Sequence, residues 1–147
     1  MKKLTALFLS AAMVLSLLML SGCSMGGPAE GTPLPQGMDE AAVITEGRKV
    51  VEMLVNEEYF EIVDLMRPDI AAGVAPGSIR ELMENVVKKA GKYVEETEAM
   101  ATGQKNKDAG ETLGEAVIFA KHDKKQVRYR IVFDPEMNLV GLQVRKY

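Results

Sequence analysis

The sequence has one histidine and 21 acidic residues, and few of these side chains are placed to carry out acid–base chemistry. Glu115 shares the alternation of Val117 and Phe119 in a predicted strand. It is therefore the best candidate for an acid that points into the interior, where burial can shift the pKa of a proton-transfer group. A strand edge or the twist of the sheet explains the same position more simply. The other groups fall in predicted turns or on a solvated helix face: His122, Asp123, Asp134 and Asp64.

These residues predict neither a metal centre nor a catalytic constellation. His122 is the only histidine, and its place in a hairpin turn predicts that it is solvated. A zinc site needs several convergent ligands, which one histidine among scattered carboxylates does not supply. The sequence also has no paired nucleophile and base, no phosphate loop and no dinucleotide fingerprint. We therefore expect no catalytic residue and no metal ligand.

Cys23, the only cysteine, is the one residue whose surroundings point to a definite reaction. A cationic start, Met1 to Lys3, precedes the apolar run from Leu4 to Leu20, a pattern typical of a secretory signal peptide over residues 1–22. The segment Leu-Ser-Gly-Cys that ends at Cys23 resembles the bacterial lipobox. This resemblance implies transfer of a diacylglyceryl group to the thiol and cleavage before Cys23. The alternative is an uncleaved membrane helix, for which the run is slightly short.

Residues 23–38 are predicted to be the lipidated cysteine and a flexible tether, because glycines and prolines punctuate the stretch. We expect the protein at the cell membrane, lipid-anchored on its extracytoplasmic face. Membrane lipid is then its first partner. We expect no cofactor other than the lipid attached covalently to Cys23.

The composition fits a single domain over residues 39–147. The chain has 147 residues, of which 47% are hydrophobic, enough for one core after a leader is removed. Its net charge of -3 lacks the strongly basic balance of a general nucleic-acid binder. A single cysteine excludes an intramolecular disulfide and a Cys-rich metal site.

The segment from Glu111 to Tyr147 predicts three antiparallel strands. Apolar residues from Val127 to Phe133 alternate with arginines, so one face of that strand is apolar. We expect the neighbouring strands to extend this face with Val117, Phe119, Val140, Leu142 and Val144. Tyr93 to Ala101 reads as a polar edge strand, and Gly103 to Gly110 as a hairpin loop.

Three helices are predicted before these strands. The first begins near Asp39 and breaks at Asn56, and the second ends at Arg67-Pro68. The third has the spacing of a capping box at Ser78 and Glu81 and stops at Gly91. Helices followed by strands predict an α+β fold with three N-terminal helices packed on an antiparallel sheet of about four strands. The expected core includes Leu82, Met83, Val86 and Ile131.

The chain from Gly47 to its end resembles short lipoprotein domains of Gram-positive bacteria whose function is not known. Three stretches carry the resemblance: Asn56 to Phe60, Gly91 to Tyr93, and Phe133 to Leu142. Such domains look like members of the ketosteroid-isomerase and nuclear-transport-factor superfamily. The resemblance implies a cone, in which a curved sheet wraps around a helix and often encloses a cavity.

The aromatic side chains of the predicted domain either line such a cavity or fill the core, which is the commoner role. They are Tyr59, Phe60, Tyr93, Phe119, Tyr129 and Phe133. Charge is uneven, because acids dominate from Asp39 to Asp64 and bases dominate from Lys121 to Tyr147. The sequence favours a module that binds a small molecule, a peptide or an envelope protein, not nucleic acid. The alternatives are a small enzyme that uses the cone cavity for acid–base chemistry, and a homodimer formed through an open sheet face.

Overall fold

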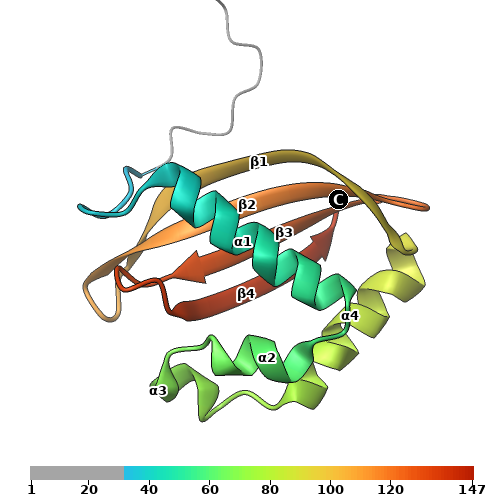
Figure 1. Ribbon diagram of the computed structural model, residues 1–147, viewed down its shortest axis with the longest axis horizontal. Coiled ribbons are helices and arrows are strands. Elements are labelled where there is room, and N and C mark those ends of the chain that lie inside the picture. Colours follow the sequence, from blue (N-terminus) through green and yellow to red (C-terminus); the bar gives the residue numbers. More distant parts are fainter. Residues whose placement is uncertain (1–31) are drawn as a thin grey trace, which may run out of the picture.

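The computed structural model describes residues 32–147, so the predicted signal peptide and Cys23 lie outside the described residues. The fold is α+β, with a four-stranded antiparallel sheet in the order β1-β2-β3-β4 (Figure 1). The described part has four helices, so the expected three are matched only in part, and α3 is the addition. The elements are α1 (Glu40–Val55), α2 (Tyr59–Asp64), α3 (Pro68–Ala71), α4 (Pro76–Ala90), β1 (Tyr93–Asn106), β2 (Glu111–His122), β3 (Gln126–Phe133) and β4 (Leu139–Lys146). Within residues 32–147 no helix is both long and apolar enough to cross a membrane.

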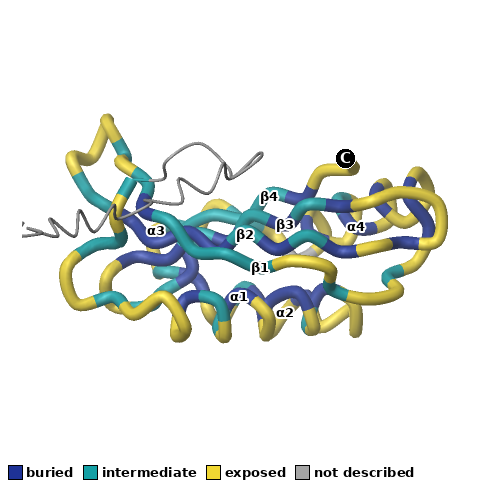
Figure 2. Tube along the Cα trace, turned by 90° about the horizontal axis from the view of Figure 1, so that it is seen from above, coloured by how far each residue is buried: buried dark blue, intermediate teal, exposed yellow. Residues whose placement is uncertain are grey.

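The two faces of the sheet differ in what covers them. Helix α1 lies across one face, and no described helix covers the other (Figure 2). We name the first the covered face; on β2 and β3 it carries Ala116, Ile118, Tyr129 and Ile131, all buried. We name the second the open face; it carries Glu115, Val117, Phe119, Arg128 and Arg130 on the same strands.

The expectation that Val117 and Phe119 extend the covered face is wrong. Val117 pairs with Arg130 and Phe119 with Arg128, so both lie on the open face. The reason is that β2 is apolar on both faces, since Ala116 and Ile118 alternate with these two residues. Alternation fixes a strand's orientation only where polar residues mark one face.

The outer strands follow the predicted pattern with two differences. Leu142 and Val144 pair with covered-face residues of β3, as expected. A shift in register between Val132 and Phe133 puts Leu139 in the core instead of Val140. Strand β1 also runs through to Asn106, so the turn is shorter than the predicted loop.

Local chemistry sets the helix ends. Asp39 caps α1 by accepting a hydrogen bond from the Ala42 amide at 2.9 Å. Helix α4 begins at Pro76 with no side-chain cap, so the capping box expected at Ser78 and Glu81 is wrong. Proline suits a first turn because its missing N–H is not needed there. Gly91 ends α4 with a φ of 85°, as its glycine predicts.

The core lies between α1, α2, α4 and the covered face. The predicted burial of Met83, Val86 and Ile131 is confirmed, whereas Leu82 is only partly buried. Helix α1 can approach β2 closely because Gly47 has no side chain; a Cβ there would lie 2.5 Å from the Cβ of Ala116.

The end of the predicted tether packs on the domain. The carbonyl of Thr32 accepts a hydrogen bond from the Gly103 amide at 2.6 Å, which joins this segment to the edge of β1. Leu34 and Met38 then pack against the core near Gly114. The packed part of the described chain therefore starts ahead of Asp39.

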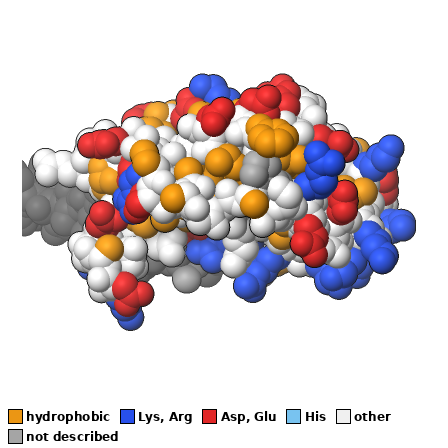
Figure 3. Space-filling view, turned by 90° about the horizontal axis from the view of Figure 1, so that it is seen from below, with side chains coloured by type: hydrophobic (Ala, Val, Ile, Leu, Met, Phe, Trp, Pro, Cys, Tyr) orange, Lys and Arg blue, Asp and Glu red, His pale blue; other side chains and the backbone are white. Residues whose placement is uncertain are grey.

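Charge is unevenly spread over the surface. Figure 3 views the molecule from below relative to Figure 1, and Lys and Arg side chains gather at its right-hand end. Figure 1 places the C-terminal end of α4 and the β2–β3 turn at that end. The surface therefore has a basic end.

Candidate functional site

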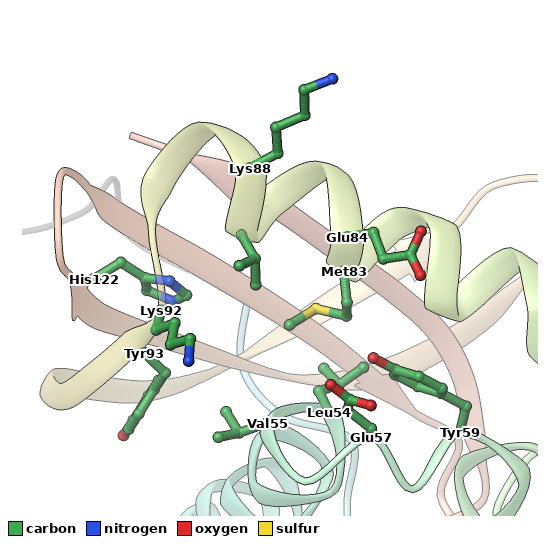
Figure 4. A pocket seen from close by; sticks show the side chains of 11 residues that line it. Leu54, Val55, Glu57, Tyr59, Met83, Glu84, Lys88, Lys92, Tyr93 and His122 are labelled. Carbon is green, nitrogen blue, oxygen red and sulfur yellow. The ribbon is translucent and has the colours of Figure 1, made fainter.

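A pocket of about 560 Å³ opens between the helices and the first strand. The end of α1, the turn after it, α2, α4, the start of β1 and the end of β2 contribute side chains (Figure 4). This volume is in the range of small-molecule sites. The lining residues are Leu54, Val55, Glu57, Tyr59, Met83, Glu84, Val87, Lys88, Lys92, Tyr93 and His122.

A backbone outlier shapes one wall of the pocket. Glu57 has a φ of 64°, the left-handed region that residues other than glycine and asparagine rarely adopt. This conformation lets the Glu58 amide donate to the carbonyl of Met53 at 2.9 Å and turns the chain directly from α1 into α2. Strained residues gather at binding sites, so a strained residue in a pocket wall supports a functional reading.

Apolar and aromatic side chains form the inner surface. Leu54 and Met83 are buried, and the Tyr59 hydroxyl points toward the pocket centre (Figure 4). The Arg80 guanidinium lies over the Tyr59 ring, 5.7 Å from its centroid. Burial is the main cause that raises the pKa of Tyr59 above its ordinary value, and that of Tyr93 likewise. Both hydroxyls therefore stay neutral donors at physiological pH.

Charges of both signs lie around the pocket. Glu57 and Glu84 lie on the side near Tyr59, and Lys92 lies near Tyr93 (Figure 4). The Lys88 side chain extends away from the pocket. An apolar pocket with an acidic and a basic side suits a ligand that has an apolar body and carries both charges, as a short peptide does.

The expectation that His122 is solvated is wrong. It is 2% exposed, because its alternation with Ile118 and Ala120 puts it on the covered face. Its Nδ1 lies 2.7 Å from the Gly91 carbonyl, which can only accept, so Nδ1 donates there. Nε2 then accepts from the Tyr129 hydroxyl at 2.8 Å. Both ring nitrogens have hydrogen-bond partners, and the buried ring supports the pocket wall.

The burial of Tyr129 reinforces this arrangement. Tyr129 is fully buried, and burial raises the pKa of its hydroxyl well above the ordinary value. The hydroxyl therefore remains a donor to His122 at physiological pH. Tyr93 packs edge-on against His122 with ring centroids 5.8 Å apart, which links the network to the pocket surface.

Glu115 is buried, and it lies on the open face, outside the pocket. Arg130 holds both its carboxylate oxygens, with Nη2 2.9 Å from Oε2. The hydrogen bonds that Arg130 donates to Glu115 raise the pKa of Arg130 above its ordinary value. A second groove of about 600 Å³ runs past this pair along Met100, Val117 and Phe119.

The structure separates the six aromatic residues predicted to line a cavity. Tyr59 and Tyr93 line the pocket described above, and Phe119 lines the groove on the open face. Tyr129 and Phe133 are buried in the core, while Phe60 is 67% exposed. Within residues 32–147 no group of three His, Cys, Asp or Glu side chains is placed to hold a metal ion.

Sequence reasoning missed several residues of the pocket. It singled out neither Leu54, Glu84 nor Lys92 as lining residues. The available signal was the position of two family-like stretches: Asn56 to Phe60 supplies Glu57 and Tyr59, and Gly91 to Tyr93 supplies Lys92 and Tyr93. Both stretches carry the family resemblance, but only the folded chain shows that they meet at one pocket.

Fold and pocket together define a small α+β domain with a ligand-sized pocket between its helices and the start of its sheet. The chain belongs to a family of proteins of unknown function (DUF3887), whose model matches residues 47–142. No curated protein matches it.

A solved structure shares the fold. The NMR structure of a protein from Ruminococcus gnavus ATCC 29149 is similar with a TM-score of 0.64 at 21% sequence identity. The similarity covers 77% of this chain and 96% of that one. The shared fold therefore makes up nearly all of that protein, whose structure was determined by NMR.

Proposed function

We propose that this protein is an extracytoplasmic lipoprotein, anchored to the membrane through Cys23, whose domain binds a small ligand or short peptide. The observation that carries the binding role is the pocket of about 560 Å³. Its apolar floor at Leu54 and Met83 supplies contact area, and the Tyr59 hydroxyl and the two charged sides supply orientation.

Binding is favoured over catalysis because the groups suited to proton transfer are already engaged. Both nitrogens of His122 have hydrogen-bond partners, and both oxygens of Glu115 contact Arg130. Glu115 also lies on the open face, whereas a catalytic acid must reach the substrate. The acids that do line the pocket, Glu57 and Glu84, are solvent-exposed.

The anchor rests on the leader sequence. A cationic start, an apolar run and Leu-Ser-Gly before Cys23 are the features that a lipoprotein signal needs. We also propose that the domain is a cone-like member of the ketosteroid-isomerase and nuclear-transport-factor superfamily. The support is a curved antiparallel sheet with α1 lying across its covered face (Figures 1 and 2).

The anchor is tested by expressing the full chain with Cys23→Ala in a bacterial host. We expect the unmodified chain to incorporate labelled fatty acid and to enter the membrane fraction. Cys23→Ala should incorporate none and should stay as an unprocessed precursor or be released. A Ser24→Ala control should behave as the unmodified chain. Equal label in Cys23→Ala would refute the anchor.

The pocket is tested on the soluble domain, residues 24–147, with a library of short peptides that contain one aromatic residue. We expect hits to raise the melting temperature of the domain. Glu57→Asn keeps a residue that tolerates the left-handed backbone and removes one pocket charge. It should weaken binding of hits that carry a basic group, whereas Glu52→Gln, on the preceding helix α1 and outside the pocket, should not. Equal weakening by both variants would argue against the pocket.

A further inference from the structure

The basic end of the molecule is a concentration of charge that the proposed pocket does not use. It consists of the C-terminal end of α4, the β2–β3 turn and the adjoining ends of β3 and β4. The turn packs on the helix end, because the Lys124 amide donates to the Ala90 carbonyl at 2.9 Å. Its side chains outside the pocket are Lys89, Lys124, Lys125, Arg128, Arg145 and Lys146.

These six side chains lack the ion-pair partners that some basic residues of the domain have. Within residues 32–147 none of them forms an ion pair. Elsewhere in the domain, Arg48 pairs with Glu96 at 2.6 Å and Arg67 pairs with Asp69 at 2.8 Å. Two acids close to the basic end are engaged: Glu95 faces Lys121, and the Asp123 carboxylate accepts a hydrogen bond from the Lys92 amide.

Two of the charges oppose each other directly. Arg128 and Arg145 are partners across β3 and β4, an arrangement that destabilises a sheet by like-charge repulsion. A polyanion that contacts both would relieve this repulsion. A cluster of unpaired like charges also attracts a ligand of the opposite charge and raises its local concentration.

A groove of about 330 Å³ gives the basic end a shape. Leu82, Val86 and Val144 form its floor between α4 and β4. Lys89, Arg145 and Lys146 line the same groove. An apolar floor with a cationic border fits a chain that alternates uncharged linkers with phosphates.

We propose that the basic end binds a linear phosphodiester polymer along the groove between α4 and β4. The choice of a polymer over the membrane surface rests on the proposed anchor at Cys23. The chain enters the domain at Thr32, which pairs with Gly103 opposite Gly114 on β2. From Gly114 to His122, β2 carries the basic end about 25 Å away from that entry point. Figure 1 places the two at opposite ends of the sheet, so the basic end faces away from the anchored end.

The test uses the soluble domain and poly(glycerol phosphate) as the probe, with binding measured against salt concentration. Lys124→Gln with Lys125→Gln removes two turn charges at the basic end. Lys105→Gln with Lys107→Gln removes two charges near the β1–β2 turn, at the other end, and is the matched control. We expect the first pair to weaken binding about tenfold at low salt and to reduce the salt slope by about 1 to 2. The control pair should change affinity less than about twofold.

A second variant addresses the groove itself. Lys89→Gln with Arg145→Gln should weaken polymer binding at least as much as the turn pair, because both side chains line the groove. Melting temperatures of all variants would verify folding. Equal losses from both ends, no binding at low salt, or tighter binding to vesicles of phosphatidylglycerol than to the polymer would each overturn the proposal. Only the preference for a polymer over the membrane rests on the proposed anchor at Cys23. The measurements themselves involve neither the pocket nor Cys23, so the failure of this proposal and the failure of the proposed function can be told apart.

Discussion

The two faces of the sheet pair their buried polar groups in different ways. On the covered face, the neutral Tyr129 hydroxyl and the His122 ring form a hydrogen-bonded chain to the Gly91 carbonyl. On the open face, Glu115 is ionic and pairs with Arg130, whose side chain is 36% exposed. A dry interior tolerates neutral polar groups whose hydrogen bonds are complete, whereas a buried carboxylate needs a cation that stays in contact with water.

This difference assigns the two faces different roles. The covered face holds the core and the wall behind the pocket, so its polar groups must be fixed. The open face is partly hydrated, so its ion pair can be lost at smaller cost. The following substitutions compare the faces directly, each measured by urea denaturation of the soluble domain.

The largest effect is expected from Ile131→Ala on the covered face. Ile131 is fully buried between α1 and the sheet, so its removal leaves a cavity. The free energy of unfolding should fall by about 2–5 kcal/mol. Val117→Ala, an apolar truncation on the open face, should cost about 1 kcal/mol or less because Val117 is partly exposed. Similar losses would remove the distinction between the faces.

Tyr129→Phe tests the neutral network. It removes the hydroxyl that donates to Nε2 of His122 and leaves this nitrogen buried without a partner. The expected loss is about 1–3 kcal/mol. The control is Tyr59→Phe, because the Tyr59 hydroxyl makes no hydrogen bond within residues 32–147 and its loss should change stability little. A loss from Tyr59→Phe as large as that from Tyr129→Phe would contradict the network.

Alkaline pH tests the same hydroxyl without a mutation. Burial raises the pKa of Tyr129 in the folded state above the ordinary value of about 10. Below that value the tyrosine is neutral in both states; above it only the unfolded state ionises readily. Stability should therefore fall as pH rises beyond about 10, by at most about 1.4 kcal/mol per pH unit for this group. Tyr129→Phe should make the decline shallower, and an unchanged slope would assign the decline to other groups.

The smallest of these effects is expected from Glu115→Gln. Water can replace the lost carboxylate around the Arg130 guanidinium, which is already about a third exposed. The expected cost is about 1 kcal/mol or less. Peptide binding in the pocket should be unchanged. A large loss of binding would place Glu115 in the functional site and revive the enzyme hypothesis.

The sequence predicted the strands whose two faces differ in polarity. In β3, Arg128 and Arg130 mark the open face, so the alternation was readable. In β2, Val117 and Phe119 are as apolar as Ile118, so the same method assigned the wrong face. The burial of His122 was missed for a different reason: the predicted turn began at His122, which is the last residue of β2.

The pocket could not be read from local patterns. It joins Leu54, Met83 and Tyr93, which are distant in sequence, and it depends on the left-handed backbone of Glu57. No propensity rule places glutamate in that conformation. By contrast, Asp39 and Gly91 act within a few residues of their helix ends, and those ends were predicted.

The most direct test of the central claim, that the pocket is the ligand-binding site, is NMR of the soluble domain with labelled methionine methyl groups and backbone amides. The ligand is the strongest hit of the peptide screen. The account predicts saturable shifts at the Met83 methyl and at the Glu57 and Tyr93 amides, with Met100 on the open face unaffected. Shifts centred on Met100, with Met83 unchanged, would contradict it.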